Sequence, residues 1–325
     1  MKLIESSAEY IPQEDGIEGV YLQIEKAARI CYKSEAKCDG TYESALKFVE
    51  KLIDRGHTAM LEHGTIYLKK YMQEWLDINK GWQKSSCNYL KGNYEYNPYS
   101  KTNTVNSFLS AKDFTTPHDS IVFITTNLRV LYENNWEGDL SHELQTLCAF
   151  PEGPHEKRYT LKLVTSIGIV RELLRHRVFS FANESTRYCN YSTDKFSNEL
   201  TFIKPYWYKQ FDAPIYNTNH RKYGTSNMFT SGDFVEFLRI AETNYLAALI
   251  AGSTPQQARE VLPLCTKSEL IMTGFESDWK HFLDLRLKGV AGEPHPDMKI
   301  LAKKIRVELL KAGFDYNKIY NNGEK

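Results

Sequence analysis

The sequence predicts a mixed fold of helices and strands, in the α/β class, without a dinucleotide-binding domain of the usual kind. Apolar residues recur at helical spacing in several segments, and other segments are rich in β-branched and aromatic residues. Neither a GxGxxG motif nor a phosphate loop is present. With 325 residues and 42% hydrophobic content, the chain is long enough to bury a sizeable core.

Helices are predicted where the apolar period is close to 3.6 residues. Val20 to Ile30 and Tyr42 to Arg55 show this period near the start of the chain. Longer helices are expected from about Asp233 to Ala251 and from about Pro296 to Ala312. Glycine commonly ends a helix, and three glycines follow these segments: Gly56, Gly252 and Gly313.

Strands are predicted at Thr65 to Tyr71 and Tyr159 to Val164. Residues 72–155 between them are interpreted as an insertion into a single domain that spans residues 1–325. Within the insertion we expect turns around Asn93 to Asn106, a strand over Ser120 to Thr126 and a helix over Leu128 to Asn134.

Charge and cysteine usage narrow the class of protein. Lysine plus arginine equals aspartate plus glutamate at 41 each, so neither nucleic acid nor an anionic membrane is expected as a partner. Without a signal peptide or a long apolar run, the prediction is a cytoplasmic protein. Six scattered cysteines indicate neither a zinc site nor a disulfide framework: Cys31, Cys38, Cys87, Cys148, Cys189 and Cys265. No bound metal is predicted.

Residues 175–188 concentrate guanidinium, imidazole and hydroxyl groups. Ser166 is placed to cap a helix that would deliver Arg175-His176-Arg177 at its C-terminal end. Guanidinium groups match phosphate oxygens and stack on flat heterocycles, so the segment suits a phosphorylated aromatic ligand. The alternative is surface ion pairing with Glu172 and Glu184.

The spacing within this segment resembles a family signature. Arg175-His176-Arg177, then seven residues, then Ser185 and Arg187-Tyr188, resembles flavin-dependent thymidylate synthases. Two other regions resemble that family in the same order along the chain. They are Gly56-His57 with Glu62-His63, and Ala258-Arg259-Glu260-Val261-Leu262-Pro263 through Phe282-Leu283-Asp284-Leu285-Arg286.

The resemblance implies a fold and a reaction. The fold would combine helices with an antiparallel-type sheet, in a homotetramer whose active sites use several subunits. The enzyme would be a methyltransferase that converts dUMP to dTMP. Methylenetetrahydrofolate would supply the carbon, and FAD reduced by NADPH would supply the hydride.

The resemblance also assigns roles to individual residues. Arg286 is the expected catalytic residue, a cation that stabilises negative charge on the uracil ring. The expected FAD contacts are Arg175, His176, Arg177, His57, Glu62, Asn183 and His281. The expected dUMP contacts are Glu172, Arg175, Glu184, Ser185, Thr186, Arg187, Arg259 and Arg286.

The sequence departs from the family at several of these positions. Asn183-Glu184 comes one place later than the family's Asn-Glu pair, so both residues are candidates for the role of the family carboxylate. Other departures fall where relatives contact FAD: Cys31, Ala59, Phe275, Ser277 and His281.

Two other functions fit parts of the same pattern. Arginines interleaved with aromatic residues suit a single-stranded nucleic-acid module, although the zero net charge opposes it. Histidines and a carboxylate also suit a metal-dependent nucleotide hydrolase, although no HExxH motif supports it. The residues for that hydrolase would be His57, Glu62, His63 and His176.

Overall fold

The computed structural model describes most of the chain. The described residues are 1–77, 81–83, 93–106, 118–140, 145–147, 153–193, 199–208, 214–217 and 228–317. Cys87 and Cys148 lie outside these ranges, and the remaining cysteines are free thiols. No helix in the described ranges combines the length and the apolarity needed to cross a membrane.

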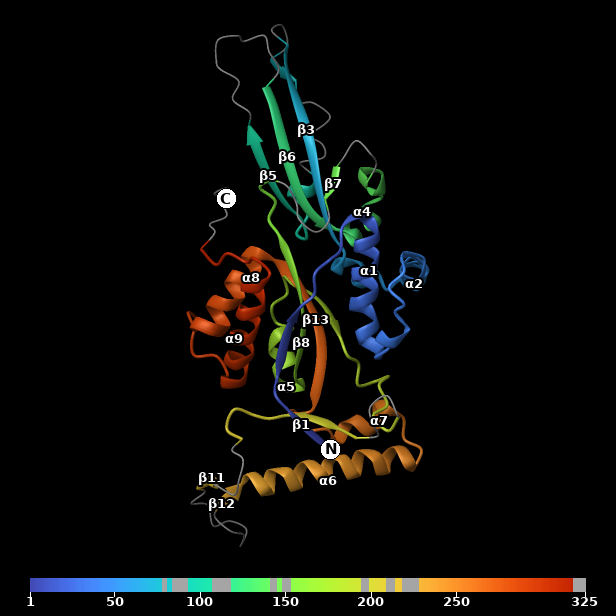
Figure 1. Ribbon diagram of the computed structural model, residues 1–325, viewed down its shortest axis with the longest axis vertical. Coiled ribbons are helices and arrows are strands. Elements are labelled where there is room, and N and C mark those ends of the chain that lie inside the picture. Colours follow the sequence, from blue (N-terminus) through green and yellow to red (C-terminus); the bar gives the residue numbers. More distant parts are fainter. Residues whose placement is uncertain are drawn as a thin grey trace.

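A four-stranded antiparallel sheet forms the centre of the molecule (Figure 1). Its strands, in spatial order, are β2 (Ser7–Tyr10), β8 (Arg158–Ser166), β13 (Lys267–Phe275) and β9 (Ser180–Asn183). β13 pairs with β8 along its whole length, from Lys267 opposite Ser166 to Phe275 opposite Arg158. The predicted class of mixed helices and an antiparallel-type sheet is therefore confirmed.

Helices cover both faces of this central sheet (Figure 1). On one face α5 (Ile167–Leu173), α8 (Glu276–Leu283) and α9 (Pro296–Lys311) bury a core with β8 and β13. On the other face Ala27 of α1 (Gly16–Arg29) and Ile30, which follows the helix, pack against Ala182 and Ile271 of the sheet. The sheet is thus the middle layer of three.

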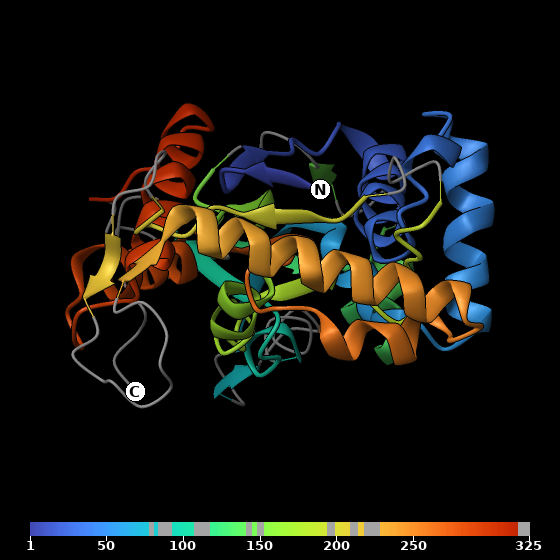
Figure 2. The same ribbon diagram turned by 90° about the horizontal axis from the view of Figure 1, so that it is seen from below.

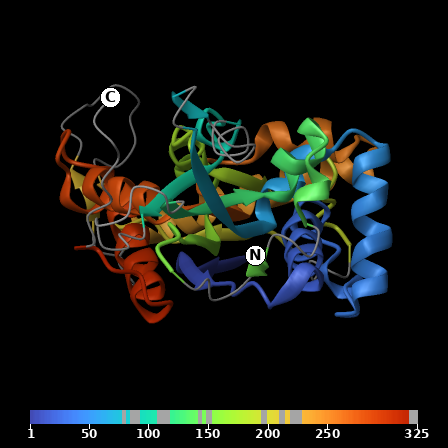
Figure 3. The same cartoon turned by 90° about the horizontal axis from the view of Figure 1, so that it is seen from above.

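A second sheet extends from one end of the molecule (Figures 1 and 3). It contains β3 (Thr65–Asp77), β4 (Gly81–Gln83), β5 (Lys101–Asn106), β6 (His118–Asn127) and β7 (Gln145–Leu147). α4 (Leu128–Asn134) follows β6. Ile66, Leu68 and Ile124 of this sheet share a core with α1 and with α2 (Tyr42–Asp54), so the second sheet packs on the N-terminal helices.

A long helix, α6 (Ser231–Ile250), crosses the opposite end of the molecule (Figure 2). Beside it in the chain are β11 (Pro214–Asn217), β12 (Met228–Thr230) and α7 (Pro255–Ala258). β1 (Lys2–Ile4) pairs in parallel with β10 (Thr201–Ile203). Phe202, Leu238 and Tyr245 form the core under α6.

Most of the predicted elements are confirmed, with small shifts at their ends. α1, α2, α4, α5, α6 and α9 correspond to predicted helices, and β3, β6 and β8 to predicted strands. Gly56, Gly252 and Gly313 adopt positive φ after their helices, as helix-ending glycines do. The expectation of turns around Asn93 to Asn106 was partly wrong, because β5 occupies Lys101–Asn106.

Candidate active site

The side chains of β13 alternate between the two faces of the central sheet. Leu270 and Met272 pack in the core with α8 and α9, whereas Ile271 packs against α1. By strand alternation, four other side chains share the face of Ile271: Lys267, Glu269, Thr273 and Phe275. Each contacts a charged or polar group there. This face of β13 is therefore largely polar.

Arg286 lies where two of the resembling regions meet. Its guanidinium donates from Nε to Nε2 of His176 at 2.8 Å and from Nη1 to Oε2 of Glu172 at 3.4 Å. α5 and the turn after it position Glu172 and His176, with Ser166 Oγ capping α5 by accepting from the Ile169 N–H at 3.3 Å. The Glu172 carboxylate thus pairs with Arg286, while no ion pair to Arg175 is found among the described residues.

The polypeptide around Arg286 is held by several contacts. The residue belongs to a π-helical turn, Asp284–Lys288, that continues α8 and ends at Gly289 with φ +74°. The Asp284 carboxylate accepts a hydrogen bond from Tyr316 and an ion pair from Lys288 at 3.1 Å. Arg286 therefore projects from a supported turn.

His176 is buried beside Arg286. Its ring meets Phe282 edge-on with centroids 5.0 Å apart, and only 9% of the residue is exposed. Burial, the Arg286 charge and the His281 charge lower the pKa of His176 to about 4. At neutral pH the ring is uncharged, which leaves Nε2 able to accept the Arg286 proton.

The loop after β9 carries the predicted phosphate contacts. The Ser185 N–H donates to the Cys31 carbonyl at 3.1 Å, and Ser185 Oγ accepts from the Arg187 N–H at 3.3 Å. Arg259 Nη1 donates to Thr186 Oγ1 at 3.3 Å. The fold thus brings Thr186 and Arg259 together although 73 positions separate them.

Arg187 is the most exposed cation of this loop. Its Nε donates to Gln256 Oε1 at 3.0 Å, and its guanidinium carbon lies 5.4 Å from the centroid of the Tyr188 ring. Neither contact neutralises its charge. Arg187 therefore remains available to an anionic group.

Asn183 and Glu184 lie on opposite faces of the central sheet. Asn183 Oδ1 accepts from Ser268 Oγ at 3.0 Å on the face away from α1. Glu184 is buried on the face of α1, where Oε2 accepts from Lys267 Nζ at 3.0 Å and Oε1 from Tyr191 at 2.9 Å. Asn183 thus shares the face of α5, which positions Glu172 and His176, and Glu184 does not.

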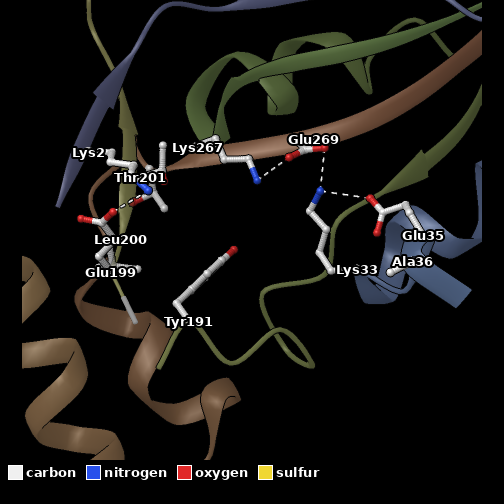
Figure 4. A pocket seen from close by; sticks show the side chains of 11 residues that line it. Lys2, Lys33, Glu35, Ala36, Tyr191, Glu199, Leu200, Thr201, Lys267 and Glu269 are labelled. Atoms are coloured by element: carbon white, nitrogen blue, oxygen red, sulfur yellow. Dashed lines mark hydrogen bonds and ion pairs between the residues drawn. The ribbon is translucent and has the colours of Figure 1, made fainter. Parts of the chain in front are cut away.

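A cavity of about 380 Å³ is lined by Tyr191 and Lys267, the two side chains that bind Glu184, and by Lys33 and Glu269 (Figure 4). Glu269 lines this cavity and forms ion pairs with Lys33 and Lys267, each at 2.6 Å, and with Lys162 at 3.1 Å. Burial opposes ionisation of Glu269, but the Lys267 and Lys33 charges outweigh it and lower its pKa to about 2. These residues form a compact charged network that joins β13 to the segment after α1.

The region of His57, Glu62 and His63 lies beside the first residue of β8. Arg158 donates to the Glu62 carbonyl at 2.9 Å, and the Glu62 carboxylate binds Arg129 of α4. His63 is fully buried with Nδ1 2.8 Å from Thr273 Oγ1, and burial and the Arg158 charge lower its pKa to about 3. His57 is exposed at the start of a 3₁₀ turn, Thr58–His63.

The remaining predicted FAD residues are at the surface. Arg175, Arg177 and His281 are exposed, and neither arginine has an ion pair within the described ranges. Both cations are therefore free to meet a diphosphate, which fits the predicted cofactor. Phe275, in contrast, is buried under Arg158, whose guanidinium carbon lies 5.3 Å from the ring centroid. At this position, where the resemblance implied a FAD contact in the family, Phe275 packs against the chain's own arginine.

Eight of the predicted residues form three groups within the chain. Arg286, His176 and Glu172 make the first, Thr186, Arg187 and Arg259 the second, and His57 with Glu62 the third. No hydrogen bond or ion pair of the described residues joins one group to another. Of the four residues of the alternative metal site, His57, Glu62 and His63 belong to the region of the third group and His176 to the first. The described ranges hold no cluster of three or more metal-ligating side chains.

Residues 155–312 match the family model described as "Thymidylate synthase complementing protein". The match covers 158 of the 325 residues, just under half of the chain, so this part of the chain is similar to that family. Every predicted site residue except His57 and Glu62 lies within the matched range.

Two relatives carry names that agree with the family. A flavin-dependent thymidylate synthase of Synechocystis is 25% identical over 160 residues, which is 45% of this chain and 64% of that protein. A probable flavin-dependent thymidylate synthase of Paramecium bursaria Chlorella virus 1 is 27% identical over 149 residues, 46% of this chain and 66% of that protein. The chain thus spans just under two thirds of each thymidylate synthase.

Solved structures resemble the chain weakly. ThyX of Helicobacter pylori, solved with FAD and dUMP, has a TM-score of 0.33 at 18% identity, covering 48% of this chain and 68% of that one. A UMP/dUMP methylase, PolB of Streptomyces cacaoi, bound with 5-Br dUMP, has a TM-score of 0.39 at 17% identity. That comparison covers 96% of this chain and 93% of the methylase.

Several residues around the candidate site were not found from the sequence. Lys33, Lys267 and Glu269 form the charged network, and Arg129 and Arg158 engage Glu62. The apolar run Leu270-Ile271-Met272 after Lys267 and Glu269 did not by itself indicate a strand, so β13 was not predicted. Arg129 and Arg158 become relevant only through contacts between distant segments.

Proposed function

We propose that the protein is a flavin-dependent thymidylate synthase that methylates dUMP at C5. The observation that supports this most is the contact of Arg286 with His176 and Glu172. The resemblance to the family assigned the region of Glu172 and His176 and the region of Arg286 to one site. In the structure these residues of two separate regions lie in contact. Methylenetetrahydrofolate would supply the carbon, and the reductant would be NADPH.

The cofactor would be FAD, which when bound supplies the hydride for the methyl group. Arg175 and Arg177 would bind its diphosphate through charge-assisted hydrogen bonds. His57 and Glu62 would form another wall of its pocket. We place His281 at the rim because it is exposed near His176.

The substrate would be held by the loop after β9. Arg187 and Arg259 would bind the dUMP phosphate, with Ser185 and Thr186 contributing hydroxyl and backbone donors. Arg286 would face the uracil edge and stabilise the negative charge that develops on the ring. No protein nucleophile is required, so Ser185 is assigned to binding.

Asn183, rather than Glu184, is the better candidate for the role of the family carboxylate. Its side chain lies on the face of α5, whereas both Glu184 oxygens are occupied by Lys267 and Tyr191. We therefore assign Glu184 to the charged network beneath the loop. Substituting Asn183 should change dUMP binding more than it changes folding.

We also propose that the active site is completed between subunits of a homotetramer. The three groups of predicted residues are not joined within one subunit. FAD, dUMP and folate together need an enclosed space, which several subunits provide more readily than one surface. Sedimentation of the flavin-loaded protein would give its assembly state.

A direct test is NADPH oxidation by the purified protein, with and without dUMP and methylenetetrahydrofolate. We expect a yellow protein whose oxidation rate rises only when both substrates are present. Insensitivity to a chelator would distinguish it from a metal-dependent hydrolase. A colourless protein that binds RNA tightly and in a salt-dependent way would instead support the nucleic-acid module.

A further inference from the structure

The guanidinium of Arg286 has two partners of unequal strength. The hydrogen bond to His176 is 2.8 Å long and reaches a buried ring, whereas the contact to Glu172 is 3.4 Å long and joins side chains that are 22% and 33% exposed. Exposed ion pairs of such length contribute little, because solvent screens them and both side chains lose rotamer freedom. His176 is therefore the partner that fixes the guanidinium plane.

The chemistry of the two groups also fixes the state of the histidine. Arginine has only donors, so the Arg286 Nε–H requires an unprotonated Nε2 on His176 and places the ring proton on Nδ1. Phe179 and Phe282 meet the ring edge-on, with centroids 6.4 and 5.0 Å away. Packing thus orients the acceptor, and the acceptor orients Arg286.

We propose that His176 is a positioning residue that acts through Arg286. This inference rests on the proposed function, because it assigns the histidine to the uracil-activating cation of that same site. The Arg286 contact occupies Nε2 of the histidine. With Nε bound to His176 and Nη1 in contact with Glu172, the Nη2 group of Arg286 is left to face the uracil.

Two substitutions of His176 distinguish the effect of its hydrogen-bond acceptor from the effect of its aromatic ring. His176→Phe keeps an aromatic ring between Phe179 and Phe282 but removes the acceptor. His176→Gln places an amide oxygen near the position of Nε2 and restores an acceptor. Arg286→Ala removes the group that the acceptor would position. Arg171→Ala, an exposed arginine of α5, is the matched surface control.

The readouts are FAD bound per chain and tritium release from dUMP labelled at C5. We expect His176→Phe to retain FAD and lose roughly tenfold or more in kcat, because a misplaced charge stabilises the reacting ring poorly. His176→Gln should recover most of that loss. The double variant His176→Phe/Arg286→Ala should be no slower than Arg286→Ala alone.

Other outcomes would overturn the inference. Loss of FAD from His176→Phe, with a rate restored by added FAD, would make His176 a flavin ligand. An equal loss of kcat in His176→Gln and His176→Phe would show that the hydrogen-bond acceptor at this position does not matter. If the fold-losses in kcat of the two single variants multiply in His176→Phe/Arg286→Ala, His176 and Arg286 act independently.

A spectroscopic measurement separates failure of this inference from failure of the proposed function. The ¹⁵N shifts of His176 in the wild-type protein should show a proton on Nδ1 and none on Nε2, and Arg286→Ala should abolish this preference. That result would support the contact even if the wild-type protein fails to act on dUMP or if His176→Phe fails to fold. An Nε2-protonated ring in the wild-type protein would refute it.

Discussion

The guanidinium of Arg158 donates to the carbonyl oxygen of Glu62 at 2.9 Å, although 96 positions separate the two residues. The chain leaves the core at Gly64, builds the second sheet, and returns at the start of β8. Arg158 also donates to Thr65 Oγ1 and Ser180 Oγ, each at 3.3 Å. We propose that the insertion spans 65–157, wider than the 72–155 expected from sequence. Arg158 would close the insertion, that is, hold its two ends together by hydrogen bonds to Glu62 and Thr65.

Arg158→Ala should lower the free energy of unfolding by about 2–4 kcal/mol, since it leaves buried acceptors without donors. Arg158→Lys should recover part of this loss, because it keeps one donor and the charge. Urea denaturation would measure both. Arg239→Ala, which removes an exposed arginine paired only at 3.6 Å, is the control. Equal midpoints for Arg158→Ala and Arg239→Ala would show that Arg158 does not close the insertion.

The charged network around Glu269 should make stability depend on pH in the acid range. The pKa of Glu269 is lowered to about 2 in the folded protein, so its contribution is present above about pH 4.5 and is lost toward pH 2. We expect the free energy of unfolding of the wild type to exceed that of Glu269→Gln by at most about 3 kcal/mol at pH 6. The difference should be smaller at pH 3. Glu236→Gln, at an exposed pair, should show no such trend.

His155 should produce a separate loss of stability at milder pH. Burial lowers the pKa of His155 to about 4 in the folded protein. Between about pH 6.5 and pH 4 the residue therefore binds a proton in the unfolded chain but not in the folded one. Stability should therefore fall from pH 7 to pH 4.5, with at most about 3 kcal/mol due to this residue. His155→Phe keeps a ring between Tyr67 and Phe123 and should flatten the profile. An unchanged slope would contradict this assignment.

Arg187→Ala and Arg259→Ala should weaken dUMP binding. Each removes a charge-assisted hydrogen bond to the proposed phosphate site, which predicts a Kd higher by roughly tenfold to a hundredfold. Bound flavin should stay constant, because neither residue is assigned to FAD. Calorimetric titration with dUMP would test this, with Arg171→Ala as the control. Unchanged affinity in both variants would place the phosphate elsewhere.

The fold was predictable where one face of an element is apolar. α2 and α9 show the helical period, and the β-branched and aromatic content of Thr65 to Tyr71 indicated β3. β13 escaped prediction although it is central. Its run Leu270-Ile271-Met272 is buried on both faces, and its Lys and Glu residues favour helices, so neither periodicity nor propensity indicated a strand.

The candidate site was predictable as a set of residues but not as an arrangement. Motif spacing selected Arg286 and His176, whose contact depends on a π-helical turn that no local pattern indicated. Strand alternation separated Asn183 from Glu184, and that required knowing that β9 ends there. The pairing of Glu62 with Arg129 depends on how the second sheet packs, which only the three-dimensional structure provides.

Formation of dTMP is the most direct test of the proposed function. The purified protein would be incubated with dUMP, methylenetetrahydrofolate, NADPH and FAD, and the nucleotides separated and identified by mass. We predict dTMP in the complete mixture and none when FAD, NADPH or the folate is omitted. Flavin-loaded protein that leaves dUMP unchanged in the complete mixture, or dTMP formed without flavin, would contradict the proposal.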